Sequence, residues 1–292
     1  MAAIISTLDY TIRRAPAALG SPKADWDSPD WSGAETLAVA LWPWAPGTAR
    51  ASANHTEHMP KVNARVMWDD DYLALMFRVD DHYVRAVANH PWNGSDSVCT
   101  DSCVEFFVSP VAGSDGYLNC EANCGGTMLI GVHGGILGDD VKMDAADRAT
   151  IPMAATMPAN TEPELVGPTT WTVEYHIPNS IFLKYFGAGA AIGGEGFRAN
   201  FYKCADKTSH PHWGCWCAPS PYAQSADEIN NGGTIAYNIV CSTNSRTLGL
   251  HFLLSMSCII RSPVDTDAPS FHQPKYFRPL TYSPATAAAG RL

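Results

Sequence analysis

Apolar and polar residues alternate along many short segments of this chain, and glycine and proline separate the segments. Alternation with a period of two is typical of strands that bury one face. Many short strands divided by turn residues predict an all-β fold, a β-sandwich of two antiparallel sheets with a jelly-roll-like layout. The expected strands are residues 36–41, 64–68, 72–80, 103–109, 117–123, 127–132, 170–177, 196–204 and 276–282.

Three local patterns refine this prediction. Almost every residue of 72–80 is apolar, which indicates a strand buried on both faces. The acidic run 69–71 before it predicts the turn of a hairpin. Residues 179–186 follow Pro178 and predict one short helix, capped by Asn179 or Ser180. In the last strand Pro279 has no N–H to donate, so we expect that strand to lie at an edge or to bend.

The periodicity fades between residues 218 and 267, where serine, threonine, asparagine, isoleucine and leucine follow in no clear order. A loop longer than about 12–15 residues is uncommon inside a compact domain. We therefore expect one β-sandwich domain over residues 25–282, with 218–267 as an irregular insertion outside the core. Translated intron sequence is our hypothesis for its origin, and sequencing of the mature transcript tests it.

Composition and charge narrow the partners. Hydrophobic residues make up 46% of the 292 residues and charged residues 16%, as in globular proteins. The 19 basic and 29 acidic residues give a net charge of −10, which argues against nucleic acid and anionic membranes as partners. The longest apolar run, 248–260, is shorter than the ~20 residues of a membrane span. Residues 1–10 carry no export signal, which predicts an intracellular protein; a start further upstream would make it extracellular.

Polar side chains recur at alternate positions of three predicted strands or strand ends. Asp101 and Glu105 open one block, Glu121 and Asn123 lie in the next, and two tryptophans lie in 209–216. A sheet of this kind has one face for the core and one that can hold a polar ligand. Sugars suit such a face, because they offer hydroxyls to acids and amides and apolar ring faces to tryptophan.

These blocks, together with Trp42-Pro43-Trp44 and residues 199–204 and 271–277, resemble the family 9 carbohydrate-binding modules, in particular the stand-alone family 9-like group. The resemblance covers most of residues 30–217 and 270–282. It implies a β-sandwich that binds glycans without catalysis, at chain ends in the better-known members. It also implies structural calcium and work alongside glycoside hydrolases.

Carried over to this chain, the resemblance implies that the carbohydrate-binding residues are Trp216, Trp213, Asp101, Glu121 and Asn123. The family's other clamp tryptophan lies two residues before the acid that corresponds to Asp101, and Cys99 stands there instead. Trp92, on a loop rich in proline and glycine, is the candidate substitute. The segment around Trp213 and Trp216 reads as a loop, so we expect at least one of the two indoles to be exposed.

Two other functions stay open. A small glycoside hydrolase would use Asp101, Glu105 or Glu121, although Asp101 and Glu105, four residues apart on one strand, have Cα atoms ~13 Å apart. Turnover of glycans, abolished by Asp101→Asn, would favour the hydrolase. A sandwich interaction protein that has lost its ligand is the other alternative, motivated by Cys99.

No cofactor is required by this interpretation, and structural calcium is the metal that the resemblance implies. The acids 69–71, Asp80 and Asp81 offer oxygen ligands, but their spacing matches no EF-hand loop, and solvated turn acids are the plainer interpretation. Asp80 and Asp81 are the metal candidates that remain. His210 and His212 flank Pro211 and could bind a metal or a hydroxyl, which a loop histidine usually does not do.

Overall fold

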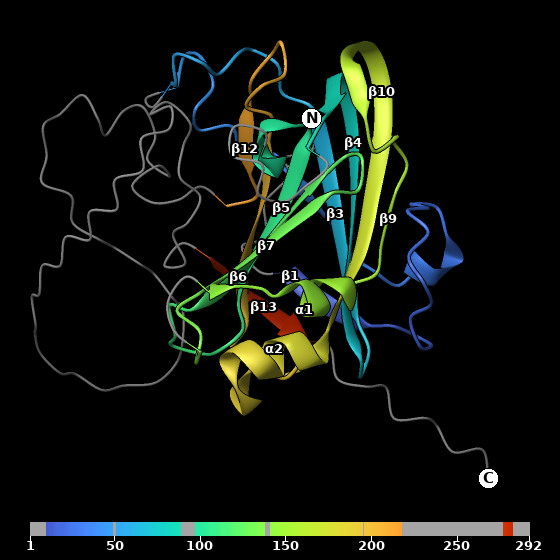
Figure 1. The fold of residues 1–292 in the computed structure, drawn as a ribbon, viewed down its shortest axis with the longest axis vertical. Coiled ribbons are helices and arrows are strands. Elements are labelled where there is room, and N and C mark those ends of the chain that lie inside the picture. The colour runs from blue at the N-terminus through green and yellow to red at the C-terminus, as the bar shows by residue number, and fades with distance from the viewer. Residues whose placement is uncertain are drawn as a thin grey trace, which may run out of the picture.

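The computed structural model describes residues 10–48, 51–88, 97–137, 141–194, 196–217 and 277–282. The predicted insertion 218–267 and the candidate Trp92 lie outside the described residues. Within them, strands dominate and form two antiparallel layers packed face to face, so the predicted β-sandwich is confirmed (Figure 1).

The first sheet is built around one long strand, β4, which pairs with a neighbour on each side. Strand β4 (Tyr72–Ala86) lies between β3 (Lys61–Trp68) and β10 (Thr161–Pro178), with β2 (Thr36–Val39) beside β3 and β9 (Met153–Ala155) beside β10. The acidic turn between β3 and β4 is confirmed, since the amide of Asp69 donates to the carbonyl of Tyr72 at 3.0 Å. Figure 1 shows β4 and β10 side by side along one layer.

The second sheet runs β8-β7-β6-β5-β11, with β12 on the far side of β11. Its strands are β5 (Cys103–Ser109), β6 (Tyr117–Asn123), β7 (Met128–His133), β8 (Val141–Lys142), β11 (Arg198–Cys204) and β12 (Trp213–Cys215). The bounds of β5 and β6 agree with the predicted ones. The three-residue β12 pairs with the end of β11 and was not predicted.

Two strands join the layers at one edge. Strand β1 (Tyr10–Arg14) pairs in parallel with β3 and with β13 (Arg278–Tyr282), and β13 pairs antiparallel with β11. Strand β13 thus has a neighbour on each side, so the expectation of an edge strand is wrong, and the alternative expectation of a bend at Pro279 stays a prediction. Pro279 is tolerated inside the strand order because its ladder with β11 has only two residue pairs, and the neighbouring amide of Leu280 donates to Phe197 at 2.7 Å.

The main core fills the space between the sheets. On β4 the residues Leu73, Leu75, Phe77 and Val79 point into this core, and all four are fully buried. The residues between them, Ala74 and Met76, pack on the other face of the sheet and are buried there as well. The prediction that this strand is buried on both faces is thus confirmed, and the reason is that chain outside the sandwich covers the sheet.

Each outer face has its own apolar cluster. The chain before β2 covers the first sheet. It contributes Ala15 and also Trp31, which lies in the 3-10 helix η1 (Pro29–Trp31). A larger cluster lies on the outer face of the second sheet and contains Trp44, Ala88, Val98, Cys103, Phe107, Tyr117, Leu129, Tyr202, Cys204, Trp213, Cys215 and Phe277. Neither sheet therefore has a fully solvated face, and polar residues on the outer faces must find partners inside the protein.

Two short α-helices occur in the described residues, α1 (Ala145–Ala149) and α2 (Asn179–Phe186), with the 3-10 turns η3 (Val98–Thr100) and η4 (Ala188–Ala190). Helix α2 matches the predicted range and lies across one end of the sandwich (Figure 1). Its N-cap is Pro178 without a side-chain bond, not Asn179 or Ser180, since Asn179 instead accepts the amide of Ile192 at 2.9 Å. None of the helices described here is long and apolar enough to cross a bilayer.

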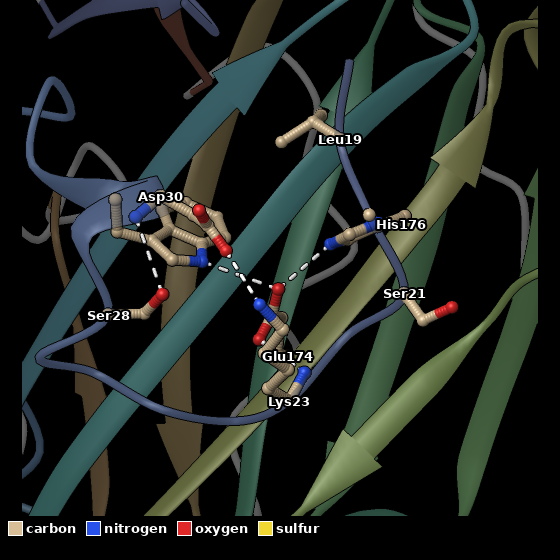
Figure 2. Close-up of a pocket in the computed structure, with 9 residues that line it drawn as sticks. Leu19, Ser21, Lys23, Ser28, Asp30, Glu174 and His176 are labelled. Atoms are coloured by element: carbon tan, nitrogen blue, oxygen red, sulfur yellow. Dashed lines mark hydrogen bonds and ion pairs between the residues drawn. The ribbon is translucent and has the colours of Figure 1, made fainter. Parts of the chain in front are cut away.

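Glu174 fixes the segment that covers the first sheet. This carboxylate on the outer face of β10 accepts the indole N–H of Trp31 at 3.3 Å and a bond from His176 at 2.9 Å (Figure 2). It also accepts the amides of Lys23 and Ala24 at 2.9 and 2.8 Å. Burial opposes its ionisation, but these bonds hold the pKa of Glu174 below its ordinary value. The same bonds hold Ala24 at a φ of +54°, which an alanine rarely adopts.

We predict that Glu174→Ala lowers the free energy of unfolding by about 2–4 kcal/mol, because several buried donors lose a charged acceptor. Chemical denaturation at neutral pH measures the change. Glu35→Ala is the control: its pair with Arg13 is exposed and is worth less than about 1 kcal/mol. Equal losses in the two variants would contradict the anchoring role.

Candidate functional site

A polar patch lies on the outer face of the second sheet, among the apolar residues described above. Side chains at alternate positions of neighbouring strands form it: Glu105 on β5, Asn119 and Glu121 on β6, and Tyr202 on β11. Glu105 stands opposite Glu121 on one side and opposite Tyr202 on the other. Directly opposed side chains have Cβ atoms about 4.5–5.5 Å apart, so the two carboxyl groups are neighbours.

Asn119 is held in one orientation and presents its amide to Glu121. Its Nδ2 donates to Oε1 of Glu121 at 2.8 Å, and its Oδ1 accepts the amide of Gly131 at 2.6 Å. Gly131 is the residue that makes room, since a Cβ at this position would lie 2.4 Å from Oδ1 of Asn119. The amide and the acid therefore form a fixed pair.

The two carboxyl groups of this patch and that of Asp206 beside it are protonated more readily than ordinary acids. Burial and the nearby charge of Asp206 raise the pKa of Glu121 to about 7, and burial raises that of Asp206 to about 6. Burial and the charge of Glu121 raise the pKa of Glu105 well above its ordinary value, although the thiol of Cys204 donates to it at 2.8 Å. A neutral carboxyl group both donates and accepts, as a sugar hydroxyl does.

The structure separates the two tryptophans of the predicted clamp. The indole of Trp213 lies on the outer face, where its N–H donates to Asp206 at 2.6 Å and its ring packs edge-on against His55. The indole of Trp216 points into the core between the sheets and packs edge-on against Tyr10 and Phe201.

Both indoles are buried, with exposed fractions of 2% for Trp213 and 7% for Trp216. The expectation that at least one is exposed is wrong. The segment is not a loop: β12 and the bond from the Trp216 amide to the Phe201 carbonyl attach it to β11. In particular, Trp216 packs as a core residue, not as a surface platform for a sugar ring.

Asp101 and Asn123 lie together but face the protein. Asp101 is fully buried and accepts bonds from Arg85 at 2.6 Å, from the amides of Val87 and Ala88 at 2.9 and 2.8 Å, and from Asn123 at 3.0 Å. The side-chain oxygen of Asn123 accepts the amide of Thr127 at 2.8 Å. Their bonding capacity is used internally, so they position the end of β4 against β5 and β6.

Cys99 lies next to the polar patch. It is partly exposed and sits on η3, at the position where the resemblance expects a tryptophan. Burial, followed by the charges of Glu121 and Asp206, raises the pKa of its thiol, so these groups are close to it. The patch therefore lies between Cys99, where the resemblance expects a clamp tryptophan, and Asp206, which binds Trp213.

The acids proposed for calcium do not converge in the part of the chain that the structure describes. Asp69 accepts the amides of Leu19, Asp71 and Tyr72, as a turn residue does. Asp70 pairs with Arg14, and Asp80 lies near Lys61 and Arg78 and accepts a bond from Thr170. Asp81 is surrounded by histidine and lysine. Calcium prefers six to eight oxygen ligands, and these residues do not fit it.

An open hollow of about 440 Å³ lies elsewhere, at the outer side of the first sheet. It is lined by Leu19, Gly20, Ser21, Tyr72, Ala149, Thr150, Pro152 and His176. It adjoins the small space around Glu174 shown in Figure 2. Since the hollow has fewer converging polar groups than the patch, the patch remains the candidate site.

Sequence reasoning found Glu105, Glu121 and Trp213 but missed Asn119, Tyr202 and Asp206. Asn119 is two residues before Glu121 on a predicted strand, so the alternation already placed both on one face. Tyr202 was hidden because a tyrosine in a strand is ordinarily a packing residue. Asp206 follows β11 in a turn, and no local pattern connects it to Trp213.

The sequence of residues 50–229 matches the family model described as "Carbohydrate-binding family 9". The chain belongs to this family. The family consists of non-catalytic binding modules. No curated protein matches the sequence.

Two solved structures share the fold of this family 9 module. One is a candidate carbohydrate-binding protein from Bacteroides uniformis, with a TM-score of 0.63 and 23% identity over 94% of this chain and 99% of that chain. The other is a family 9 module from Caldicellulosiruptor kristjanssonii in complex with cellotriose, with a TM-score of 0.50 and 11% identity over 97% and 98% of the two chains.

We predict that the polar patch contributes less to stability as pH rises from about 4.5 to about 7. An acid with a raised pKa keeps its proton in the folded chain where the unfolded chain has lost it, so its contribution is complete below the ordinary value of 4.5 and is lost as pH rises toward about 7. This contribution to the free energy of unfolding should fall by about 1–3 kcal/mol between pH 5 and pH 8. Burial lowers the pKa values of His55 and His212, which makes stability rise with pH below 6.5, so the difference between the wild type and Glu121→Gln isolates the contribution of the patch. Denaturation curves over this range measure it.

Glu121→Gln should flatten this dependence, because glutamine resembles the neutral acid and does not ionise. Glu35→Gln, at an exposed position, should leave the slope of the wild type. If the stability of Glu121→Gln changed with pH between pH 5 and pH 8 as that of the wild type does, the patch would not hold its acids neutral.

Proposed function

We propose that this chain binds carbohydrate through the polar patch of the second sheet, without catalysis. The observation that carries the proposal is the gathering of fixed amide and carboxyl groups of Asn119, Glu121 and Glu105 at alternate positions of neighbouring strands. Membership in carbohydrate-binding family 9 and the cellotriose complex of a module with the same fold support it.

In this proposal Glu121 and Asn119 bind the sugar hydroxyls. Of the two, Glu121 is 7% exposed and Asn119 is 2% exposed, so contact requires an opening beside Cys99, which is partly exposed. Trp213 supports the patch through its bond to Asp206. Its ring is buried, so it would contact a sugar only if the residues packed over it moved. Asp101 and Asn123 act indirectly, by fixing the strand ends that frame the patch.

A catalytic alternative has one observation in its favour: Glu105 and Glu121 are adjacent acids with raised pKa values. A retaining glycosidase holds its two carboxyl groups about 5–5.5 Å apart, with one of them protonated. Both groups here are almost fully buried, which leaves little space for a glycosidic bond and an attacking water. Non-catalytic binding therefore remains the proposal. In this role the chain would work beside glycoside hydrolases.

Isothermal titration with a panel of gluco-, xylo- and manno-oligosaccharides, cellotriose among them, tests the proposal. We expect saturable binding of at least one sugar, weakened about tenfold by Glu121→Ala, since a buried partner left without its hydrogen bond costs about 1–3 kcal/mol. Trp216→Phe should lower stability but leave affinity unchanged. Tyr72→Ala, in the hollow of the first sheet, is the matched control.

Two outcomes would contradict this assignment. Affinity lost in Tyr72→Ala and kept in a folded Glu121→Ala would move the site to the hollow. Release of shorter sugars from the same oligosaccharides, abolished by Glu121→Gln, would make the protein a hydrolase.

A second prediction concerns the glycine under the patch. Gly131→Ala should displace the Asn119 side chain and break its bond to Glu121, because the added Cβ occupies the position of Oδ1. Sugar affinity should fall about as far as in Asn119→Ala. Gly189→Ala, where nothing lies within 4 Å of the new Cβ, should leave affinity unchanged. Full affinity in a folded Gly131→Ala would remove Asn119 from the site.

A further inference from the structure

A second polar cluster lies between the two sheets, at the rim of the main core. Asp81 continues the inward-facing positions of β4, and His58 and His212 come from the segments before β3 and β12. The Nε2 atom of His58 lies 2.7 Å from Oδ1 of Asp81. One possible ligand atom from each of the three residues lies within 4.8 Å of the other two.

Two atoms of this cluster are buried without a hydrogen-bond partner. Oδ1 of Asp81 accepts from His58 and from the amides of His82 and Tyr83, at 2.7, 2.8 and 3.4 Å. Oδ2 of Asp81 and Nε2 of His212 have no such partner, although Asp81 is 5% exposed and His212 is fully buried. A buried polar atom left without a partner costs about 1–3 kcal/mol, so a pair of them at one place indicates something that both atoms bind.

The protonation of the cluster suits a metal. Burial, with the charge of Lys203, lowers the pKa of His212 well below its ordinary value, so the imidazole is neutral. Burial opposes ionisation of Asp81, but the His58 bond and the charge of Lys203 hold the pKa of its carboxyl below the ordinary range. Metal ions bind neutral imidazole and ionised carboxylate.

We propose that His58, Asp81 and His212 bind one divalent transition-metal ion of the zinc class. Two imidazole nitrogens and one carboxylate oxygen are ligands that zinc takes in proteins, with a fourth position left for water or another group. The same set is a poor match for calcium, which prefers oxygen ligands alone.

The geometry requires only small movements. Ligands on one tetrahedral zinc are about 3.4 Å apart at bond lengths near 2.0–2.1 Å. The atoms here lie within 4.8 Å of one another, so the more distant ones would close in by at most about 1.4 Å. The Nε2 atom of His58 and Oδ1 of Asp81, 2.7 Å apart, would separate by less than an ångström. His58 gives access from solvent, since its side chain is 16% exposed while that of Asp81 is fully buried.

Lys203 is the group that opposes a cation. Its Nζ lies 3.9 Å from Oδ2 of Asp81, donates to the carbonyl of Cys204 at 2.8 Å and sits over the Trp171 ring. It neutralises Asp81 across the core, and its charge weakens metal binding. The proposal therefore predicts that Lys203→Met, of similar length and without charge, binds zinc more tightly than the wild type.

Cobalt and zinc titrations of the full chain test the site. The wild type should bind one equivalent of Co²⁺ with visible d–d bands and no thiolate charge-transfer band, and Zn²⁺ should displace it. His58→Gln and Asp81→Asn should weaken zinc binding by at least about 100-fold, since even outer partners of a metal are worth about 10–100-fold. His82→Gln and Asp80→Asn, adjacent in sequence and outside the cluster, are the matched controls and should bind as the wild type does.

The near-ultraviolet circular dichroism of His58→Gln and Asp81→Asn must match that of the wild type, which shows that each variant is folded when its zinc affinity is compared. If Asp81→Asn does not fold, His58→Gln decides, because its side chain is partly exposed. The proposal is overturned if the wild type binds no equivalent of cobalt, or if the folded variants bind as tightly as the wild type. A thiolate charge-transfer band would also overturn it, because it would assign the ion to cysteines such as Cys103 and Cys204, which lie with Glu105 elsewhere in the second sheet. Weaker binding by Lys203→Met would contradict a metal beside Asp81.

Discussion

Strands β5, β6 and β11 and the second half of β10 are covered on both faces, and that single constraint governs their polar residues. Alternate side chains of a strand point to opposite faces, so along these stretches a residue that points away from the core does not reach open water. It enters a second buried layer and must find a partner there. Glu174 finds its partners in the amides of Lys23 and Ala24. Asp101 finds them in the side chain of Arg85 and in the amides of Val87 and Ala88. The loops over the sheets are thus held by buried acids.

The polar patch meets the same constraint in another way. Glu105 and Glu121 stand opposite each other, and their repulsion and burial are relieved by proton uptake. The arrangement costs stability at high pH, and such costs tend to remain where a ligand uses the groups. The cluster around Asp81 differs, because a lysine already balances the acid there and two atoms are still without partners.

Alternation carried much of the fold prediction. Residues 103–109 and 117–123 were bounded correctly because inward and outward positions both repeat over seven residues, long enough for the period to be plain. The three-residue strands Met153–Ala155 and Trp213–Cys215 are too short to show a period. The missed strand Tyr10–Arg14 forms by parallel pairing with distant strands, which a local pattern does not contain.

The site was harder to predict for a related reason. Which tryptophan faces the patch depends on the register of β12 against β11: Trp213 stands opposite Cys204, and Trp216 lies three residues further, on the inward side. A shift of one residue would exchange faces, and sequence alone does not fix that register. The roles of Asp101 and Asn123 were likewise invisible, because their partners are backbone amides, which no residue type reveals.

The junction between the sheets has a consequence for how the chain is made. Tyr10 and Leu280 are paired residues of β1 and β13, so the junction of the two sheets joins segments that are about 270 residues apart along the chain. During synthesis the ribosome releases β1 long before β13, and β1 must wait beside β3 with its other edge unpaired. An unpaired strand edge invites pairing with other chains. Aggregation of nascent chains, rather than unfolding of the finished protein, is therefore the hazard that this topology creates, and slow closure is its kinetic signature.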